Sequence, residues 1–197
     1  AKKAADEADR CWRKYVPTGE SDYLARKGVK AYGLRFSPSG NGTVAVPMLR
    51  DGRVVGLQII RGKDRGNKLE KQYWPAGMDK VGAYHLIGGI PRGLVLVAEG
   101  YATAATLHES TGLPVAVAFD AGSLMPVVAD LAQKYRTSKI LICADDDYLT
   151  PGNPGCEAAR LAATAHGAAW CSPKFSEERS TTKKGPTDYN DLANLEG

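Results

Sequence analysis

Acidic side chains follow two apolar runs in the second half of the chain. Glu99 comes directly after one run, and Asp145, Asp146 and Asp147 come directly after another. Successive side chains of an extended segment alternate, so Asp145 and Asp147 are expected to point to one side and Asp146 to the other. These carboxylates have no Lys or Arg beside them in the sequence and need a cation. Hard oxygen ligands favour Mg²⁺ or Mn²⁺ over zinc.

A simpler interpretation of the aspartate triplet is a solvated acidic turn that caps a helix. A single glutamate before a helix also suits the helix dipole. Glu99 stands at the end of an equivalent apolar run, however, and this makes metal binding the better interpretation of the two acidic groups together. A late pair, Asp188 and Asp191, is placed to add to the same acidic edge.

The apolar runs that carry these carboxylates alternate with helical patterns. Strands are predicted over 94–98, 115–119, 139–144 and 168–171, and helices over 101–109, 123–135 and 155–165. Strands that alternate with helices form a parallel sheet with helices on both faces. Ligands bind at the carboxyl ends of such strands, so both acidic groups are expected at one edge of the sheet.

The first half of the chain has a different pattern. Helices are predicted over 1–14 and 22–27, ahead of two β-rich segments, 43–49 and 53–60. Asp51-Gly52 lies between these segments, which is a strong hairpin signal. The turn-rich segment 88–93 then separates the two patterns. We therefore predict a smaller basic α+β subdomain over 1–93 and a parallel α/β subdomain over 94–197.

Charge is divided unevenly along the 197 residues. Residues 1–97 hold 18 Lys and Arg against 9 Asp and Glu, whereas 98–197 hold 8 against 13. A basic half beside an acidic half suggests a polyanion on one side and bound cations on the other. The composition is that of a globular protein, and no run of 18 apolar residues predicts a membrane span. The first residue is Ala rather than Met, which suggests an excised fragment.

The four cysteines and three histidines show no metal-ligand spacing. No C-x-x-C pair is present, which argues against a structural zinc site. No basic-then-apolar leader opens the chain. A reduced, cytoplasmic protein is therefore the expectation.

Cations cluster ahead of the parallel half. The group comprises Arg61, Lys63, Arg65, Lys68, Lys71 and Lys80. Tyr73 and Trp74 follow Lys71, and cations beside aromatic rings suit a single strand, with charges along its phosphates and a ring against a base. For the two aromatic residues we favour an anchoring role in the core. For the cations we favour nucleic-acid or nucleotide binding.

Several of these segments resemble a known family. Residues 97–104, V-A-E-G-Y-A-T-A, resemble the E-G-Y-A-T-A signature of primases from conjugative plasmids and satellite phages. The aspartate triplet resembles the D-x-D motif of the Toprim fold, which bacterial primases, topoisomerases and some nucleases share. The segments 119–123 and 187–192 resemble further segments of these primases, and the basic half resembles the subdomain ahead of their Toprim fold.

The resemblance implies the catalytic core of a DNA primase, a nucleotidyltransferase of plasmid or phage replication. Its template would be single-stranded DNA, its substrates nucleoside triphosphates, its cofactor Mg²⁺ or Mn²⁺, and a fused or recruited helicase a further partner. Asp145, Asp147 and Asp188 would hold metal. Glu99 would hold metal or accept the proton of the attacking hydroxyl, and the cations would bind phosphates or template.

Two departures from the family pattern stand in the sequence. Thr103 occupies a position where bacterial replicative primases often carry Asp, and residues 148–154 form an insertion after the triplet. The alternatives are a Toprim nuclease, which cuts phosphodiesters with the same carboxylates, and a non-catalytic single-strand-binding or docking module. A topoisomerase is disfavoured, because nothing here marks its attacking tyrosine.

Overall fold

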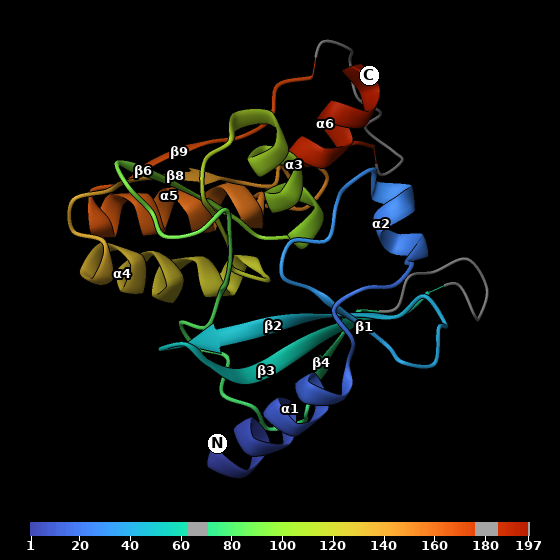
Figure 1. The fold of residues 1–197 in the computed structure, drawn as a ribbon. Helices are drawn as coiled ribbons and strands as arrows, with labels where there is room; N and C mark the ends of the chain where they lie inside the picture. Colours follow the sequence, from blue (N-terminus) through green and yellow to red (C-terminus); the bar gives the residue numbers. More distant parts are fainter. Residues whose placement is uncertain (63–70, 176–184, 197) are drawn as a thin grey trace. The chain divides into compact units, whose positions relative to one another are not determined.

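The computed structural model describes residues 1–62, 71–175 and 185–196 (Figure 1). Contacts divide the chain into two compact units, Ala1–His85 and Leu86–Gly197. We call them the first and the second unit. The turn-rich segment 88–93 belongs to the second unit.

The first unit is an antiparallel sheet with two helices. Its strands lie in the order β1 (Arg35–Phe36), β2 (Val44–Arg50), β3 (Arg53–Ile60) and β4 (Lys71–Trp74), and its helices are α1 (Lys2–Lys14) and α2 (Asp22–Lys27). Asp51 and Gly52 both adopt positive φ, 50° and 74°, as a two-residue hairpin turn requires. The predicted hairpin between β2 and β3 is confirmed.

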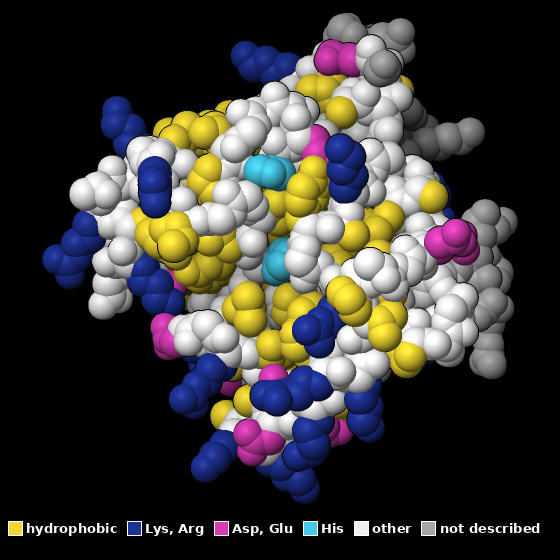
Figure 2. Space-filling view, viewed as in Figure 1, with side chains coloured by type: hydrophobic (Ala, Val, Ile, Leu, Met, Phe, Trp, Pro, Cys, Tyr) yellow, Lys and Arg dark blue, Asp and Glu magenta, His cyan; other side chains and the backbone are white. Residues whose placement is uncertain are grey.

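Helix α1 packs against β3 and closes the core of this sheet. Ala8 is fully buried among Ala45, Leu57 and Ile59, and Trp12 packs against the same cluster. A small residue at position 8 lets the helix backbone approach the sheet closely. Figure 2 shows dark-blue Lys and Arg side chains gathered over α1, at the bottom of the view.

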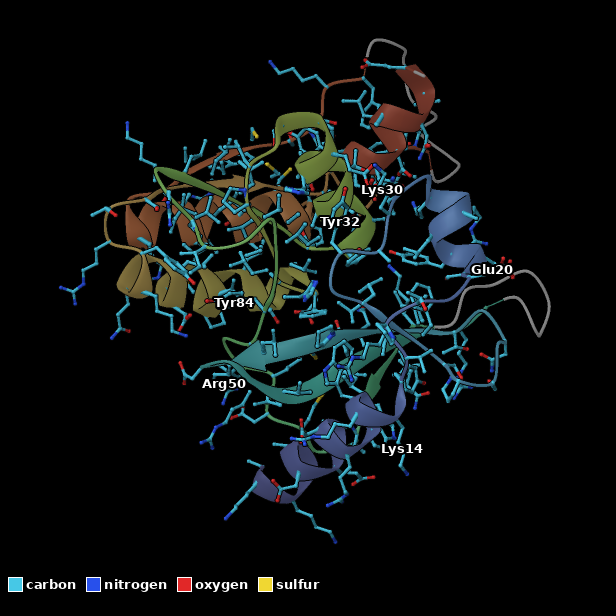
Figure 3. All side chains as sticks on the ribbon, viewed as in Figure 1. Lys14, Glu20, Lys30, Tyr32, Arg50 and Tyr84 are labelled. Carbon is cyan, nitrogen blue, oxygen red and sulfur yellow. The ribbon has the colours of Figure 1, made fainter. Side chains whose placement is uncertain are left out.

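The end of β2 is fixed by an arginine. Arg50, labelled in Figure 3, donates to Oδ2 of Asp79 at 2.9 Å and to the carbonyl of Val81 at 2.6 Å. A backbone bridge pairs Leu49 with Tyr84 nearby. These bonds hold the segment that follows β4 against the sheet.

The second unit contains a five-stranded sheet. Its strands lie in the order β5 (His85–Ile87), β7 (Val115–Val117), β6 (Leu94–Ala98), β8 (Lys139–Cys143) and β9 (Ala169–Cys171). The pairs β6–β7, β6–β8 and β8–β9 are parallel. The four predicted strands are β6, β7, β8 and β9, so the parallel sheet is confirmed.

Helices cover both faces of this sheet, as predicted. They are α3 (Tyr101–Thr111), α4 (Leu124–Lys134), α5 (Pro154–His166) and α6 (Tyr189–Glu196), with a short 3₁₀ turn, η1 (Ala121–Ser123). The chain moves from β6 to β7 on one side, then crosses back to β8 and on to β9. Because such crossovers are right-handed, α3 lies on one face and α4 and α5 on the other. In Figure 1, α4 and α5 run side by side and α6 lies against α3.

Candidate active site

The centre of the sheet brings the two predicted acidic groups together. β6 and β8 are neighbours, with Ala98 paired to Cys143. After β6 the chain turns into α3, and after β8 it turns toward α5 on the opposite face. The two connections diverge, which is the arrangement that opens a ligand crevice at the carboxyl ends of parallel strands. Glu99 directly follows Ala98, and Asp145 follows Cys143 by two residues.

Glu99 is the most perturbed carboxyl group of the site. The pKa of Glu99 is raised from 4.5 to about 7 by burial and by the negative charges of Asp147, Asp120 and Asp188. A hydrogen bond from the backbone N–H of Asp145 acts in the opposite direction and lowers this pKa. Burial is the largest cause, since a charged group loses hydration there. Oε1 of Glu99 is buried and accepts no hydrogen bond from any described residue. A half-neutralised carboxyl with an unused oxygen can accept a proton or bind a cation.

The aspartate triplet is held by a loop rather than by the strand. β8 ends at Cys143, so strand alternation does not extend through the triplet as the sequence predicted. Asn153 holds the loop instead. Its Nδ2 donates to Oδ1 of Asp146 at 2.6 Å, and its Oδ1 accepts from the N–H of Asp147 at 2.9 Å. The side chain of Asp146 is therefore hydrogen-bonded to Asn153. The negative charge of Asp147, in contrast, raises the pKa of Glu99.

The insertion 148–154 forms consecutive turns that deliver Asn153 to this position. Thr150 N–H donates to the carbonyl of Asp147 at 2.7 Å, and Asn153 N–H donates to the carbonyl of Thr150 at 2.9 Å. Asn153 has φ 43°, in the left-handed region that Asn tolerates better than most residues. It then becomes the cap residue of α5, with Pro154 in the first turn.

Gly155 lets the start of α5 approach the carboxylates. A Cβ at this position would overlap the backbone oxygen of Asp145 and lie 3.0 Å from Oε1 of Glu99. Only a residue without a Cβ fits there. Neither Gly155 nor Asn153 was predicted from the sequence as a site residue. The signal for Asn153 was present in the Asn-Pro pair, a helix-start pattern.

Asp120 is a further acidic residue that the sequence analysis quoted within 119–123 without assigning it a role. Its charge raises the pKa of Glu99, and its Oδ1 accepts from Oγ of Ser123 at 2.8 Å. The preceding Phe119 is buried with φ 77°. A bulky residue in the left-handed region is strained, and such strain concentrates at functional sites.

The late acidic segment 187–192, which contains Asp188 and Asp191, is tied to the aspartate triplet through the backbone. Asp146 N–H donates to the carbonyl of Thr187 at 2.8 Å. Oδ1 of Asp188 accepts from the N–H of Asp191 at 2.9 Å, and Oδ2 of Asp191 accepts from the N–H of Thr187 at 3.0 Å. Asp188 therefore caps α6 and also contributes negative charge at Glu99.

The donor set suits a hard divalent cation. The acidic groups offer carboxylate oxygens, one of them the buried and unused Oε1 of Glu99, and oxygen ligands are those that Mg²⁺ and Mn²⁺ prefer. Within the described ranges, no three His, Cys, Asp or Glu side chains already form a group that could hold a metal ion. Thr103, at the departure from the replicative-primase pattern, is buried in α3 and adds no charge.

The predicted cations lie in the first unit. Arg61 is exposed and donates to Oε1 of Gln72 at 3.2 Å. Lys71 Nζ lies 5.7 Å from the ring centre of Tyr23, and Lys80 Nζ lies 4.6 Å from that of Tyr73. The remaining three cations, Lys63, Arg65 and Lys68, lie outside the described residues.

Among the described residues, none of the helices combines the length and the apolar character that crossing a membrane needs.

The sequence is similar to known primases. Two Escherichia coli proteins, both named DNA primase TraC, are each 32% identical to the chain over 168 and 171 residues, which is 81% and 82% of it. The chain spans 11% and 16% of the length of these curated relatives.

Solved primase structures share the fold. A DnaG primase catalytic domain bound to single-stranded DNA matches with a TM-score of 0.63 at 14% identity, covering 100% of this chain and 75% of that one. The primase fragment of the bacteriophage T7 primase-helicase matches with a TM-score of 0.62 at 16% identity, covering 91% and 71%. The family profile of the Toprim domain matches residues 94–197, more than half of the chain. The chain therefore belongs to the Toprim domain family.

Proposed function

We propose that the chain is the catalytic core of a DNA primase, which joins nucleotides into short primers on a single-stranded DNA template. One observation carries the proposal. Glu99, directly after β6, keeps a buried oxygen with no hydrogen bond from the described residues and a pKa of about 7 beside the charges of Asp147, Asp120 and Asp188. The similarity to the TraC primases supports this assignment of the site.

In this reaction the 3′-hydroxyl oxygen forms a bond to the α-phosphorus of a nucleoside triphosphate. The bond from that phosphorus to the β-phosphate oxygen breaks, pyrophosphate leaves, and the hydroxyl loses its proton. A carboxylate that lies beside the attacking hydroxyl can accept that proton, directly or through water. We assign this role to Glu99.

Asp145, Asp147 and Asp188 are proposed to hold the divalent cations, and for Glu99 metal binding is the alternative to accepting the proton. Bound Mg²⁺ or Mn²⁺ would supply activation of the hydroxyl and stabilisation of the leaving oxygens. Asn153 positions this loop by holding Asp146 and the backbone of Asp147. The proposal covers both Mg²⁺ and Mn²⁺ as the bound ion.

The first unit is proposed to bind template and triphosphate. Arg61, Lys71 and Lys80 would neutralise phosphates, because such contacts position a nucleic acid without reading its sequence. Lys63, Arg65 and Lys68 belong to the same proposal. For the whole protein, this activity implies a role in plasmid or phage replication and a cytoplasmic location. It also implies a helicase as a partner, either fused or recruited.

The alternatives are a Toprim nuclease and a non-catalytic single-strand-binding module. One experiment separates all three. The 197-residue chain is incubated with Mg²⁺, labelled nucleotides and a single-stranded template carrying a short annealed primer, which removes the need for initiation. A primase core lengthens the primer, and a nuclease shortens the template or the primer. A binding module retards the template in a native gel and leaves the length of both strands unchanged. Asp145→Asn should abolish lengthening, and lengthening that persists would contradict the assignment.

A further inference from the structure

Three of the four cysteines gather beside the candidate active site. Cys143 and Cys171 end the neighbouring strands β8 and β9 and are register partners, so both side chains leave the same face of the sheet. Cys156 of α5 lies close to the same loop, with its thiol 3.6 Å from the backbone oxygen of Asp145. All four cysteines carry free thiols.

The two paired cysteines have different surroundings. Cys171 is half-buried, whereas Cys143 is 3% exposed. The sulfur of Cys171 accepts a hydrogen bond from the hydroxyl of Tyr189, 3.1 Å away. The neighbouring Cys143 thiol, as the largest cause, and the Tyr189 hydroxyl lower the pKa of Cys171 to about 6. Cys171 is therefore the accessible and nucleophilic member, because the thiolate is the reactive form.

The spacing of the pair suits a covalent bond. Register partners on neighbouring strands have Cα atoms about 4.8 Å apart, within the range of about 4.4–6.8 Å found in disulfides. β9 is the outer strand of the described sheet and pairs with β8 alone. A strand at the edge can shift slightly to bring the two sulfur atoms into bonding distance.

We propose that Cys143 and Cys171 form a reversible intrachain disulfide on exposure to hydroperoxides. The Cys171 sulfur attacks one peroxide oxygen, the O–O bond breaks, and hydroxide leaves and takes up the proton that Cys171 released. The product is water and a sulfenic acid on Cys171. The Cys143 sulfur then attacks the Cys171 sulfur, the S–O bond breaks, and a second water leaves with the Cys143 proton. In total the two thiols lose two electrons and two protons, and the peroxide takes them up to give two water molecules.

The test measures the bond itself and does not depend on the proposed activity. The 197-residue chain is treated with hydrogen peroxide, its remaining thiols are alkylated, and the products are mapped by mass spectrometry. The expected result is a loss of about 2 Da, two fewer alkylated thiols and a peptide that joins Cys143 to Cys171. Dithiothreitol should restore both thiols.

Variants identify the partners. Cys171→Ser should abolish the bond and, being half-buried, leaves the core intact, whereas Cys11→Ser in α1 should leave the bond unchanged. Tyr189→Phe removes one hydrogen-bond donor from the Cys171 sulfur, so oxidation should slow several-fold at neutral pH while the product stays the same.

Three outcomes would overturn the proposal. One is a peptide that joins Cys156 to either partner in place of the Cys143–Cys171 link. Another is a mass gain that dithiothreitol does not reverse, which marks sulfinic or sulfonic acid. The third is an unchanged thiol count under peroxide exposure that fully oxidises a small dithiol in the same tube.

Discussion

The side-chain oxygen of Asn153 accepts a hydrogen bond from the backbone N–H of Asp147, with 2.9 Å between the two atoms. The amide nitrogen of the same side chain donates to Asp146 at 2.6 Å. One residue at the start of α5 thus holds both the backbone and one carboxylate of the aspartate triplet. This contact explains how a triplet that lies beyond the end of its strand keeps a defined shape.

Asn153→Gly tests this contact without adding backbone strain. Glycine accepts the left-handed conformation at φ 43°, so any loss comes from the missing side chain. We expect primer extension to fall by about tenfold or more, because a misplaced ligand loop weakens metal affinity by about 10–100-fold. Calorimetric titration with Mg²⁺ checks the affinity. Unchanged Mg²⁺ affinity and extension would remove Asn153 from the site.

Gly155→Ala tests the close approach of α5. The added Cβ would overlap the backbone oxygen of Asp145 and press on Oε1 of Glu99, so the helix or the loop must shift. Overpacking of this kind destabilises by about 1–3 kcal/mol, and activity should fall further than stability alone explains. Gly122→Ala is the matched control, because its Cβ would meet only Oδ1 of Asp120 at an ordinary 3.5 Å. Equal effects of the two substitutions would refute the close-approach argument.

Stability without metal should depend on pH through Glu99. The folded state raises the pKa of Glu99 from 4.5 to about 7, so it favours the protonated form. The contribution is fully present below about pH 4.5. It is lost as pH rises through about 7, because the unfolded chain releases the proton first. The loss amounts to about 3 kcal/mol.

Urea unfolding in the presence of a chelator, at pH 5 and pH 8, measures this effect. Glu99→Gln has no proton to lose, so the gap in stability between variant and parent should widen in favour of the variant at pH 8. Other titrating groups cancel in this comparison. A gap that is the same at both pH values would show that Glu99 is not perturbed.

Arg61, Lys71 and Lys80 of the first unit are expected to bind single-stranded DNA through its phosphate groups. Arg61→Ala, Lys71→Ala and Lys80→Ala are each expected to weaken binding of single-stranded DNA and to lower the slope of log affinity against log salt by about 0.7. Lys14→Ala in α1 changes the charge of the same unit equally and serves as the control. Fluorescence anisotropy over a range of salt measures both quantities. If the three variants match the control, the first unit does not bind through these residues.

The predicted elements that hold up are those with strong local signals. The Asp51-Gly52 hairpin and the strand before Glu99 follow from turn chemistry and from an uninterrupted apolar run. The short strands β1, β4 and β5 were not predicted, because they consist of few residues and form through pairing with distant strands. α6 was also missed, since its eight residues carry a weak apolar pattern.

The candidate active site also contains a part that the sequence predicts and a part that it does not. The meeting of Glu99 with the aspartate triplet follows from the topology of a parallel sheet, which a sequence pattern predicts. The contacts of Asn153 and Gly155 depend on the turns of the insertion, which has no periodic pattern. The pairing of Cys143 with Cys171 depends on the register of two strands that lie 28 positions apart in the sequence. Register of that kind is decided by packing and carries no local signal.

The most direct test of the account is the effect of Glu99→Gln on primer extension and on melting temperature, measured on the same preparation with Mg²⁺ for activity and with a chelator for melting. Gln keeps the size of the side chain but loses the charge and the ability to accept a proton. The account predicts that extension falls by about 10²-fold or more, that the affinity for single-stranded DNA hardly changes, and that the melting temperature at pH 8 holds or rises because clustered negative charge is relieved. A variant that melts at a lower temperature and extends primers at the parent's rate would show that Glu99 only supports the start of α3, and would contradict its place in the chemistry.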